Sequence, residues 1–264
     1  MPKGYKYIDT HSHLYDEAFR DDVDEAVSRA LAAGVGLILQ PDVDSRERGG
    51  MKKLRERFPD VFLNRAGLYP GSVDENWEKE VELVRRSAME DGAVAIGEIG
   101  LDYHYSKESA GLQKAALKAQ LELAAELDLP VNIHLREAEN DFFEVLESCR
   151  HLGLSGNLHA FSGSVETFRR IEKYGDWYVG IGGVLTFKNA RVAESLKSIP
   201  LDRIVLETDS PYLTPVPYRG RRNESSYIPV IAAAVAGIKG TSVDEVAGVT
   251  TENAEKLFKI KRQP

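Results

Sequence analysis

The segment Asp9-Thr10-His11-Ser12-His13 places two imidazoles two residues apart, directly after a short hydrophobic run. Alternate residues of a β-strand share one face, so we expect Asp9, His11 and His13 to point the same way. Two histidines on one side of a strand end can hold a metal ion, and a nearby carboxylate can orient a ligating ring. The spacing therefore predicts a metal site, with a pair of surface histidines as the alternative.

Further polar residues lie within or at the end of later hydrophobic runs. Glu98 interrupts the apolar run 94–101, where a carboxylate is costly to bury unless it is paired or binds a metal. The others are Asn132, His134 and Arg136, which alternate with apolar residues, then His159, and finally Glu207 and Asp209, which share a face.

The candidate metal ligands are His11, His13, Glu98, His134, His159 and Asp209. Four imidazoles and two carboxylates form a mixed nitrogen and oxygen set that suits Zn²⁺, Mn²⁺ or a similar ion. Six ligands exceed the needs of one tetrahedral ion, so we expect two ions bridged by Glu98. The remaining histidines, His104 and His151, are expected at the surface.

The spacing of apolar residues predicts the elements that position these side chains. Strand-like runs occur at residues 6–13, 36–41, 61–68, 93–101, 130–135, 156–161, 177–181 and 203–208. Helical patterns occur at residues 22–33, 77–89, 108–127, 141–151, 165–174 and 190–197, and residues 242–245 form a capping box that begins a final helix.

Eight strand-helix units in 264 residues allow 33 residues for each unit. This predicts an α/β fold, a (β/α)8 TIM barrel, as a single domain over residues 1–264. A doubly wound open sheet is the alternative. In a barrel, the chemistry is expected at the C-terminal ends of the strands, where the candidate ligands lie.

The composition restricts the class of protein. The net charge is −8 and 42% of residues are hydrophobic, which predicts an acidic globular protein without a general nucleic-acid-binding surface. The single cysteine, Cys149, excludes an internal disulfide and suits the cytoplasm. We expect no membrane segment, no signal peptide and no obligate protein partner. An anionic substrate would need a local cationic site.

The ordered motifs DTHSHL, GEIGLDY, NIHLR, HAFSG and ETDSPYLTP, followed by PVPYRGRRNE, resemble the TatD family of metal-dependent deoxyribonucleases, which are amidohydrolase-like barrels. The resemblance extends from Asp9 to about Phe258. It implies that His11, His13, Glu98 and Asp209 hold a first metal and that Glu98, His134 and His159 hold a second. It also implies that Asp209 and Glu98 are the catalytic residues, with Asp209 as general base, and that Arg136, Arg219 and Asn223 approach the substrate phosphate.

Two departures from the family pattern stand out. Family members usually have Gly-x-His-Pro-His after the third strand, whereas this chain has Gly67-Leu68-Tyr69-Pro70-Gly71. A substrate-contacting imidazole is therefore absent. The family's Asn-Glu-Pro is Asn223-Glu224-Ser225 here, a change expected to alter only a turn.

Three functions are compatible with these residues. The leading hypothesis is a phosphodiesterase that uses Zn²⁺, Mg²⁺ or Mn²⁺ to hydrolyse DNA, from a 3′ end or on single strands. The alternative is an amide, ester or lactone hydrolase on the same dinuclear centre, which the missing histidines and the acidic surface favour. The third is a barrel that binds a partner without catalysis. The basic cluster Arg219, Arg221 and Arg222 is either a solvated loop or a phosphate site.

Overall fold

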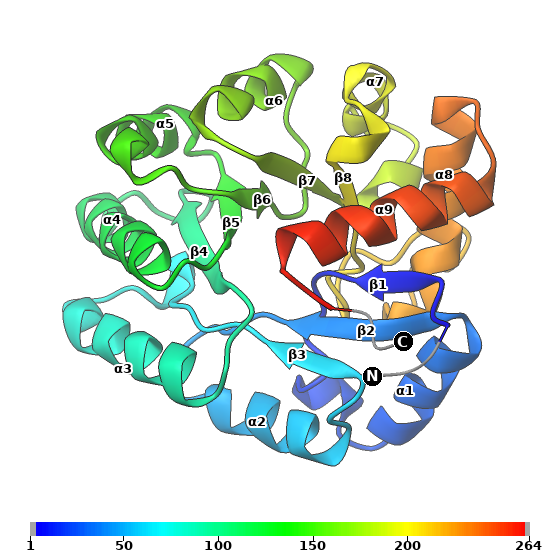
Figure 1. Cartoon of the computed structure of the whole chain (residues 1–264), viewed down its shortest axis with the longest axis horizontal. Coiled ribbons are helices and arrows are strands. Elements are labelled where there is room, and N and C mark those ends of the chain that lie inside the picture. The colour runs from blue at the N-terminus through cyan, green and yellow to red at the C-terminus, as the bar shows by residue number, and fades with distance from the viewer. Residues whose placement is uncertain (1–3, 262–264) are drawn as a thin grey trace.

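The computed structural model describes residues 4–261, and within them eight parallel strands form the barrel (Figure 1). The strands are β1 (Tyr7–Asp9), β2 (Val35–Gln40), β3 (Phe62–Asn64), β4 (Ile96–Asp102), β5 (Val131–Arg136), β6 (Gly156–Leu158), β7 (Trp177–Ile181) and β8 (Ile204–Leu206). They pair in the orders β1-β2-β3 and β4-β5-β6-β7-β8. Parallel bridges from Ala66 to Ile96 and from Ser12 to Ser210 join the two arcs into a ring.

Helices surround this ring. The described α-helices are α1 (Val23–Ala32), α2 (Arg48–Arg57), α3 (Trp77–Glu90), α4 (Ala110–Glu126), α5 (Glu139–Ser148), α6 (Val165–Ile171), α7 (Val192–Ser198), α8 (Ile228–Lys239) and α9 (Val243–Leu257). The predicted (β/α)8 barrel and the positions of its strands are confirmed, and the open-sheet alternative is wrong because the ring closes. Met1–Lys3 and Arg262–Pro264 of the predicted domain lie outside the described residues.

The first strand is shorter than the predicted 6–13 and ends at Asp9. Beyond it the backbone alternates between neighbours: Thr10 N–H donates to Leu206 O at 2.9 Å, and Ser12 N–H donates to Leu39 O at 3.2 Å. The segment that carries His11 and His13 is therefore held between β8 and β2 rather than along one ladder, and strict strand alternation does not describe it.

Helix α8 was not predicted from the sequence. Its residues, IPVIAAAVAGIK, are almost all apolar, so no 3.6-residue period distinguishes one face from the other. Pro229 lies in the first turn, where a missing N–H costs no helical hydrogen bond. The predicted helix 141–151 begins earlier, at Glu139, and ends at Ser148; Cys149 after it is buried, as expected of a small apolar residue.

Helix α9 closes the N-terminal end of the barrel. In Figure 1 it crosses the ring in front of β8 and above β1. Asn253 Nδ2 donates to Ile204 O at the start of β8, and Thr251 Oγ1 donates to Lys6 O just before β1. The apolar interior at this end combines strand residues such as Leu39 with Phe258. The barrel is therefore open only at the C-terminal ends of its strands.

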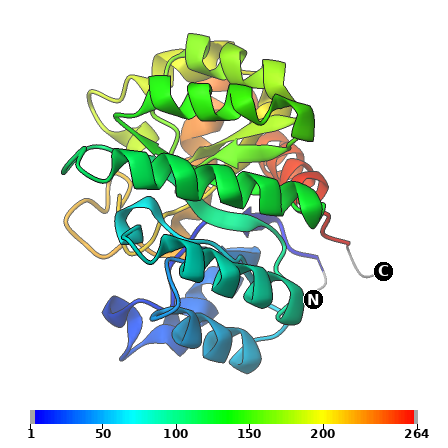
Figure 2. The same ribbon diagram turned by 90° about the vertical axis from the view of Figure 1, so that its left-hand side faces the viewer.

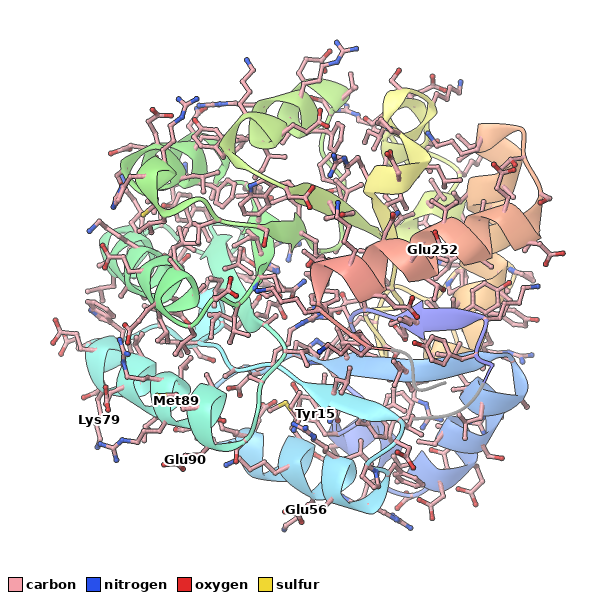
Figure 3. The ribbon with its side chains drawn as sticks, viewed as in Figure 1. Tyr15, Glu56, Lys79, Met89, Glu90 and Glu252 are labelled. Atoms are coloured by element: carbon pink, nitrogen blue, oxygen red, sulfur yellow. The ribbon has the colours of Figure 1, made fainter. Side chains whose placement is uncertain are left out.

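Figure 2 shows the barrel from the side. The long loops that follow β4 (green) and β8 (gold) project to the left, and α9 (red) lies on the right. The outer helical surface is polar: Figure 3 shows Glu56, Lys79, Glu90 and Glu252 on the outside of their helices, with the exposed Met89 beside Lys79 and Glu90 on α3. No single helix among residues 4–261 has the length and hydropathy of a membrane span, although the bent pair Ser225–Lys239 and Val243–Leu257, at 108°, passes by length and composition alone.

Replacing Phe258 by alanine tests the closure of the barrel. The ring is 3% exposed and packs inside the barrel, 5.1 Å from the guanidinium of Arg65. Its removal leaves a cavity, so we expect the free energy of unfolding in urea to fall by about 3–5 kcal/mol. The control is Met89→Ala on the outer surface, expected to change it by less than about 0.5 kcal/mol. Equal stability of the two variants would contradict this packing.

Candidate metal centre

The six predicted ligands come together at the open end of the barrel. A cavity of about 300 Å³ there is lined by His13, Glu98, His134, His159 and Asp209, among others. His11 lies beneath them with no exposed surface. The chain brings these residues from the ends of five strands to one place because parallel barrel strands all end on the same side.

Glu98 lies at the middle of the cluster. Its Oε1 is 2.9 Å from His134 Nδ1 and 3.7 Å from His159 Nε2. Its Oε2 is 3.3 Å from His11 Nε2 and 4.0 Å from His13 Nε2. Each carboxylate oxygen therefore faces its own pair of imidazoles, and one carboxylate joins two adjacent groups of metal-binding atoms.

Asp209 completes the group around His11 and His13. Its Oδ1 lies 3.6 Å from His11 Nε2 and 3.5 Å from His13 Nε2. The residue has a φ of 58°, in the left-handed region that is uncommon without glycine and that often marks functional residues. Its N–H donates to His11 O at 2.8 Å, so the backbone at Asp209 is bound directly to the backbone of a predicted ligand.

The second nitrogen of each imidazole in the cluster also has a partner. His11 Nδ1 faces Asn132 Oδ1 at 3.1 Å, and His159 Nδ1 faces Glu207 Oε1 at 3.1 Å. These partners accept hydrogen bonds, which favours a proton on Nδ1 and leaves Nε2 free for a metal; the donor Arg65 Nη1 also lies 3.3 Å from His11 Nδ1. For His134 the roles are reversed, since its Nε2 faces Asp102 Oδ2 at 2.8 Å and its Nδ1 faces Glu98.

His13 follows the same rule through a tyrosine. Its Nδ1 lies 3.0 Å from Tyr15 Oη, and that hydroxyl donates to Pro41 O at 2.8 Å. The hydroxyl has therefore used its proton and accepts from Nδ1. The Nε2 atoms of His11 and His13, 3.2 Å apart, then present two lone pairs to each other beside two carboxylates. Such a group repels itself without a cation, and this donor set fits a divalent metal.

The pKa values of Glu98, His159 and His11 also indicate that the site needs positive charge. Although burial alone would raise it, the positive charge of His159 and the hydrogen bond from His134 hold the pKa of Glu98 well below its ordinary range. Burial would lower the pKa of His159, but the charges of Glu207, Asp209 and Glu98 outweigh it and raise that pKa to about 10. Burial, together with His159, lowers the pKa of His11 to about 4. Without a metal, a proton on His159 supplies the compensating charge.

A buried arginine beneath the cluster was missed by sequence reasoning. Arg65 has no exposed surface, and its Nη1 donates to Asn132 Oδ1 at 3.2 Å while its Nη2 donates to Thr10 O. Burial lowers the pKa of Arg65 to about 10, so it stays charged near neutral pH. The only sequence feature that could have revealed Arg65 is its position within the apolar run 61–68. An arginine there resembles an ordinary surface residue of a strand.

Asp9 supports the predicted ligands through the backbone rather than through a histidine ring. Its carboxylate does not contact a histidine ring; it accepts from the backbone N–H of His11 at 3.3 Å and from the N–H and hydroxyl of Thr208 at 3.0 and 2.6 Å. Asp9 therefore ties the segment after β1 to the segment after β8, which carries Asp209. It positions two predicted ligands through their backbones.

The predicted substrate contacts lie apart from the cavity. Arg136 is exposed at the end of β5, with its guanidinium 5.6 Å from the ring centre of Tyr105, and does not face inward with Asn132 and His134. Arg219 lines a separate hollow. Asn223 departs from the prediction most: it is fully buried, and its Nδ2 donates to the carbonyls on either side of Asp209, Thr208 O at 2.8 Å and Tyr212 O at 2.6 Å. It has no surface with which to meet a substrate.

Tyr69 forms one wall of the cavity, where the family pattern has a histidine. Its ring packs edge-on against His134, with ring centres 5.1 Å apart, and its hydroxyl donates to Asp102 Oδ2 at 3.4 Å. A Cβ at Gly71 would lie 2.5 Å from the Tyr69 ring. Tyr69 and Gly71 therefore depart from the family pattern together, because a side chain at residue 71 would press on the tyrosine ring.

The two remaining histidines stay outside the cluster, as predicted. His104 is exposed in the loop after β4, where its Nδ1 lies 2.6 Å from Glu137 Oε1, and His151 is exposed after α5.

Comparison with known proteins agrees with this geometry. The model of a family described as TatD related DNase matches residues 8–259. The uncharacterized metal-dependent hydrolase YabD of Bacillus subtilis (strain 168) is 37% identical over 254 residues, which cover 96% of this chain and 99% of that protein. The 3'-5' ssDNA/RNA exonuclease TatD of Pantoea ananatis is 36% identical over 258 residues, which cover 95% of this chain and 98% of that protein.

Among solved structures, YJJV, a TatD homologue from Escherichia coli K12, has a TM-score of 0.89 at 27% identity and covers 97% of this chain and 99% of that one. The family match, the sequence relatives and the fold all extend over almost the whole chain. This chain therefore belongs to the TatD family of metal-dependent hydrolases.

Proposed function

We propose that this protein is a dinuclear phosphodiesterase that hydrolyses DNA, at 3′ ends or on single strands, with the whole chain 1–264 acting as one barrel. The observation that carries the proposal is Glu98, whose two oxygens each face a separate pair of imidazoles. A relative that is 36% identical is named as a 3'-5' exonuclease of single-stranded DNA and RNA. The single buried cysteine suits the cytoplasmic location that we propose with it.

In this proposal, His11, His13, Glu98 and Asp209 hold one ion, and Glu98, His134 and His159 hold the other. The ions are Zn²⁺, Mg²⁺ or Mn²⁺. A divalent ion lowers the pKa of a coordinated water from about 15.7 to about 7 and neutralises charge on phosphoryl oxygens.

The chain supplies the remaining steps. Asp209, 15% exposed at the cavity, accepts the proton that the attacking water loses as its oxygen bonds to phosphorus and the ester oxygen leaves. Glu98 stays ionised between the imidazoles and keeps the two halves of the site together. Arg136, exposed at the end of β5, supplies positive charge near the incoming phosphate.

A second candidate function is hydrolysis of a small amide, ester or lactone on the same centre. The observation that favours it is the wall of the cavity, where Asp16 and Glu47 add carboxylates beside Tyr69. Carboxylates facing a phosphodiester backbone are unfavourable, whereas a small uncharged substrate would not be repelled.

The histidines of the second metal group can be tested by metal content. We expect the wild-type protein to bind two ions in calorimetric titration and His134→Ala to bind one, because His11, His13 and Asp209 remain. His151→Ala, which removes an exposed histidine outside the site, should still bind two. Two ions in the His134→Ala protein would contradict the assignment, and elemental analysis of the dialysed samples provides an independent count.

The general base can be tested by Asp209→Asn, which keeps a metal-binding oxygen but cannot accept the proton. We expect kcat on a labelled single-stranded oligonucleotide with Mg²⁺ or Mn²⁺ to fall by about 10²- to 10⁴-fold. Asp202→Asn, on an exposed residue before β8, should leave kcat unchanged. If DNA hydrolysis survives both this change and the double change His134→Ala with Asp209→Ala, the proposed chemistry is wrong.

A substrate panel separates the two candidate functions. The metal-loaded protein is tested against single-stranded DNA, single-stranded RNA, lactones, cyclic amides and simple esters under one set of conditions. Hydrolysis of the oligonucleotides that is lost in Asp209→Asn is the expected result. Turnover of a lactone or amide, with no cleavage of either nucleic acid, would replace the nuclease proposal by the small-molecule one.

A further inference from the structure

A second hollow lies on the same end of the barrel as the metal centre. It has a volume of about 630 Å³ and is formed by the loop between β7 and α7 together with the loop between β8 and α8. Three cationic side chains, Lys188, Arg191 and Arg219, line it with the ring of Phe187, and no carboxylate does. In a chain with a net charge of −8, such a wall is unusual.

These three cations are not neutralised by the fold. Within residues 4–261, Lys188, Arg191 and Arg219 form no ion pair. Arg222, only three residues beyond Arg219, differs: its Nη1 lies 2.6 Å from Asp22 Oδ1. Within the basic cluster recognised in the sequence, Arg222 is therefore structural and Arg219 is available to a ligand, while Arg221 is exposed outside the hollow.

The walls of the hollow are held together by contacts between its two loops. The Arg219 guanidinium lies over the Phe187 ring, 4.0 Å from its centre, and so joins the two loops. Val216 N–H donates to Thr186 Oγ1 at 2.8 Å and joins them a second time. Stacking and a hydrogen bond from Arg219 Nη1 to Thr214 O at 3.4 Å hold Arg219 in place, and its other N–H groups can donate to a ligand.

The hollow adjoins the metal centre. Val184 and Val192 line both the hollow and a narrow gap that is also bounded by Asp209. A larger groove of about 710 Å³ leaves the centre at His159 and shares Ser162 with the hollow. That groove is lined by three carboxylates and one lysine, Glu137, Glu139, Asp141 and Lys107. A chain of phosphates that reaches the metals is therefore repelled by the groove and attracted by the hollow.

We propose that the hollow of Phe187, Lys188, Arg191, Val216 and Arg219 binds the backbone phosphates of a single-stranded nucleic acid while another part of the strand lies at the metal centre. The inference rests on the proposed nuclease function and names the part of this chain that holds the substrate away from the cut. Positive charge here gives affinity for a polyanion without sequence preference, which the acidic walls of the metal cavity cannot provide.

The test replaces all three cations in Lys188→Ala/Arg191→Ala/Arg219→Ala. For a twelve-nucleotide single strand we expect KM to rise by about tenfold or more with kcat little changed, because phosphate contacts remote from the cut contribute to binding. A dinucleotide is too short to span both sites, so the triple variant should cleave it as efficiently as the wild type does. The slope of log(1/KM) against log salt should become shallower by about 0.7 for each phosphate that is no longer neutralised, or about 2 for three phosphates.

The matched control, Lys79→Ala/Arg86→Ala/Lys173→Ala, removes the same charge from exposed residues on the outer surface. Lys79 is labelled there in Figure 3. Because Arg219 packs on Phe187, the double reversal Lys188→Glu/Arg191→Glu provides a second variant that keeps this packing. The same KM and salt slope in the hollow variants and the control would overturn the inference.

Direct binding separates this inference from the proposed function. Fluorescence anisotropy with labelled oligo(dT) measures binding to wild-type and variant proteins without turnover. If the wild type cleaves no nucleic acid, the proposed function fails, and weaker oligo(dT) binding by the triple variant than by its control would still support the hollow. If cleavage occurs but binding is equal in all variants, only the inference about the hollow fails.

Discussion

A carboxylate with almost no access to water sets the demands on this structure. Glu98 has a side chain that is 4% exposed, and an isolated buried charge would be prohibitively unfavourable. The four surrounding imidazoles interact with that charge, and each of them then needs a hydrogen-bond partner for its second nitrogen. Asn132, Tyr15, Glu207 and Asp102 meet that need. The barrel interior at the C-terminal ends of the strands is polar for this reason. The interior at the opposite end, which α9 covers, is apolar.

The sequence could predict the barrel and the clustering of its ligands, because hydrophobic runs locate strands and a barrel places all strand ends on one side. It could not predict contacts made across the chain. Arg65 meets Thr10 only because β3 and β1 belong to one ring, and Asn223 becomes structural only because its loop folds back on Thr208. Helix α8 escaped prediction for a different reason, since uniform apolar composition carries no period. In each case the missing information is tertiary.

Asn223 connects the two functional regions. Its amide holds the carbonyl of Thr208, next to Asp209, and also the carbonyl of Tyr212. The loop between those anchors and Asn223 itself carries Arg219 and Val216, which form the basic hollow. Any displacement of this loop therefore acts on the bonds that hold the backbone of Asp209. Arg219, one of the three cations of the hollow, therefore lies on a segment that is fixed to the metal centre.

Tyr69 and Gly71 constrain the order in which such a site can evolve. Because a Cβ at residue 71 would meet the Tyr69 ring at 2.5 Å, a larger residue at 71 requires that ring to move. A change from this site to one with histidines at both positions avoids the contact when residue 69 is replaced first. In the opposite direction, residue 71 is replaced by glycine first. The intermediate with histidine at 69 and glycine at 71 avoids this contact, so it is the ancestor to look for among relatives.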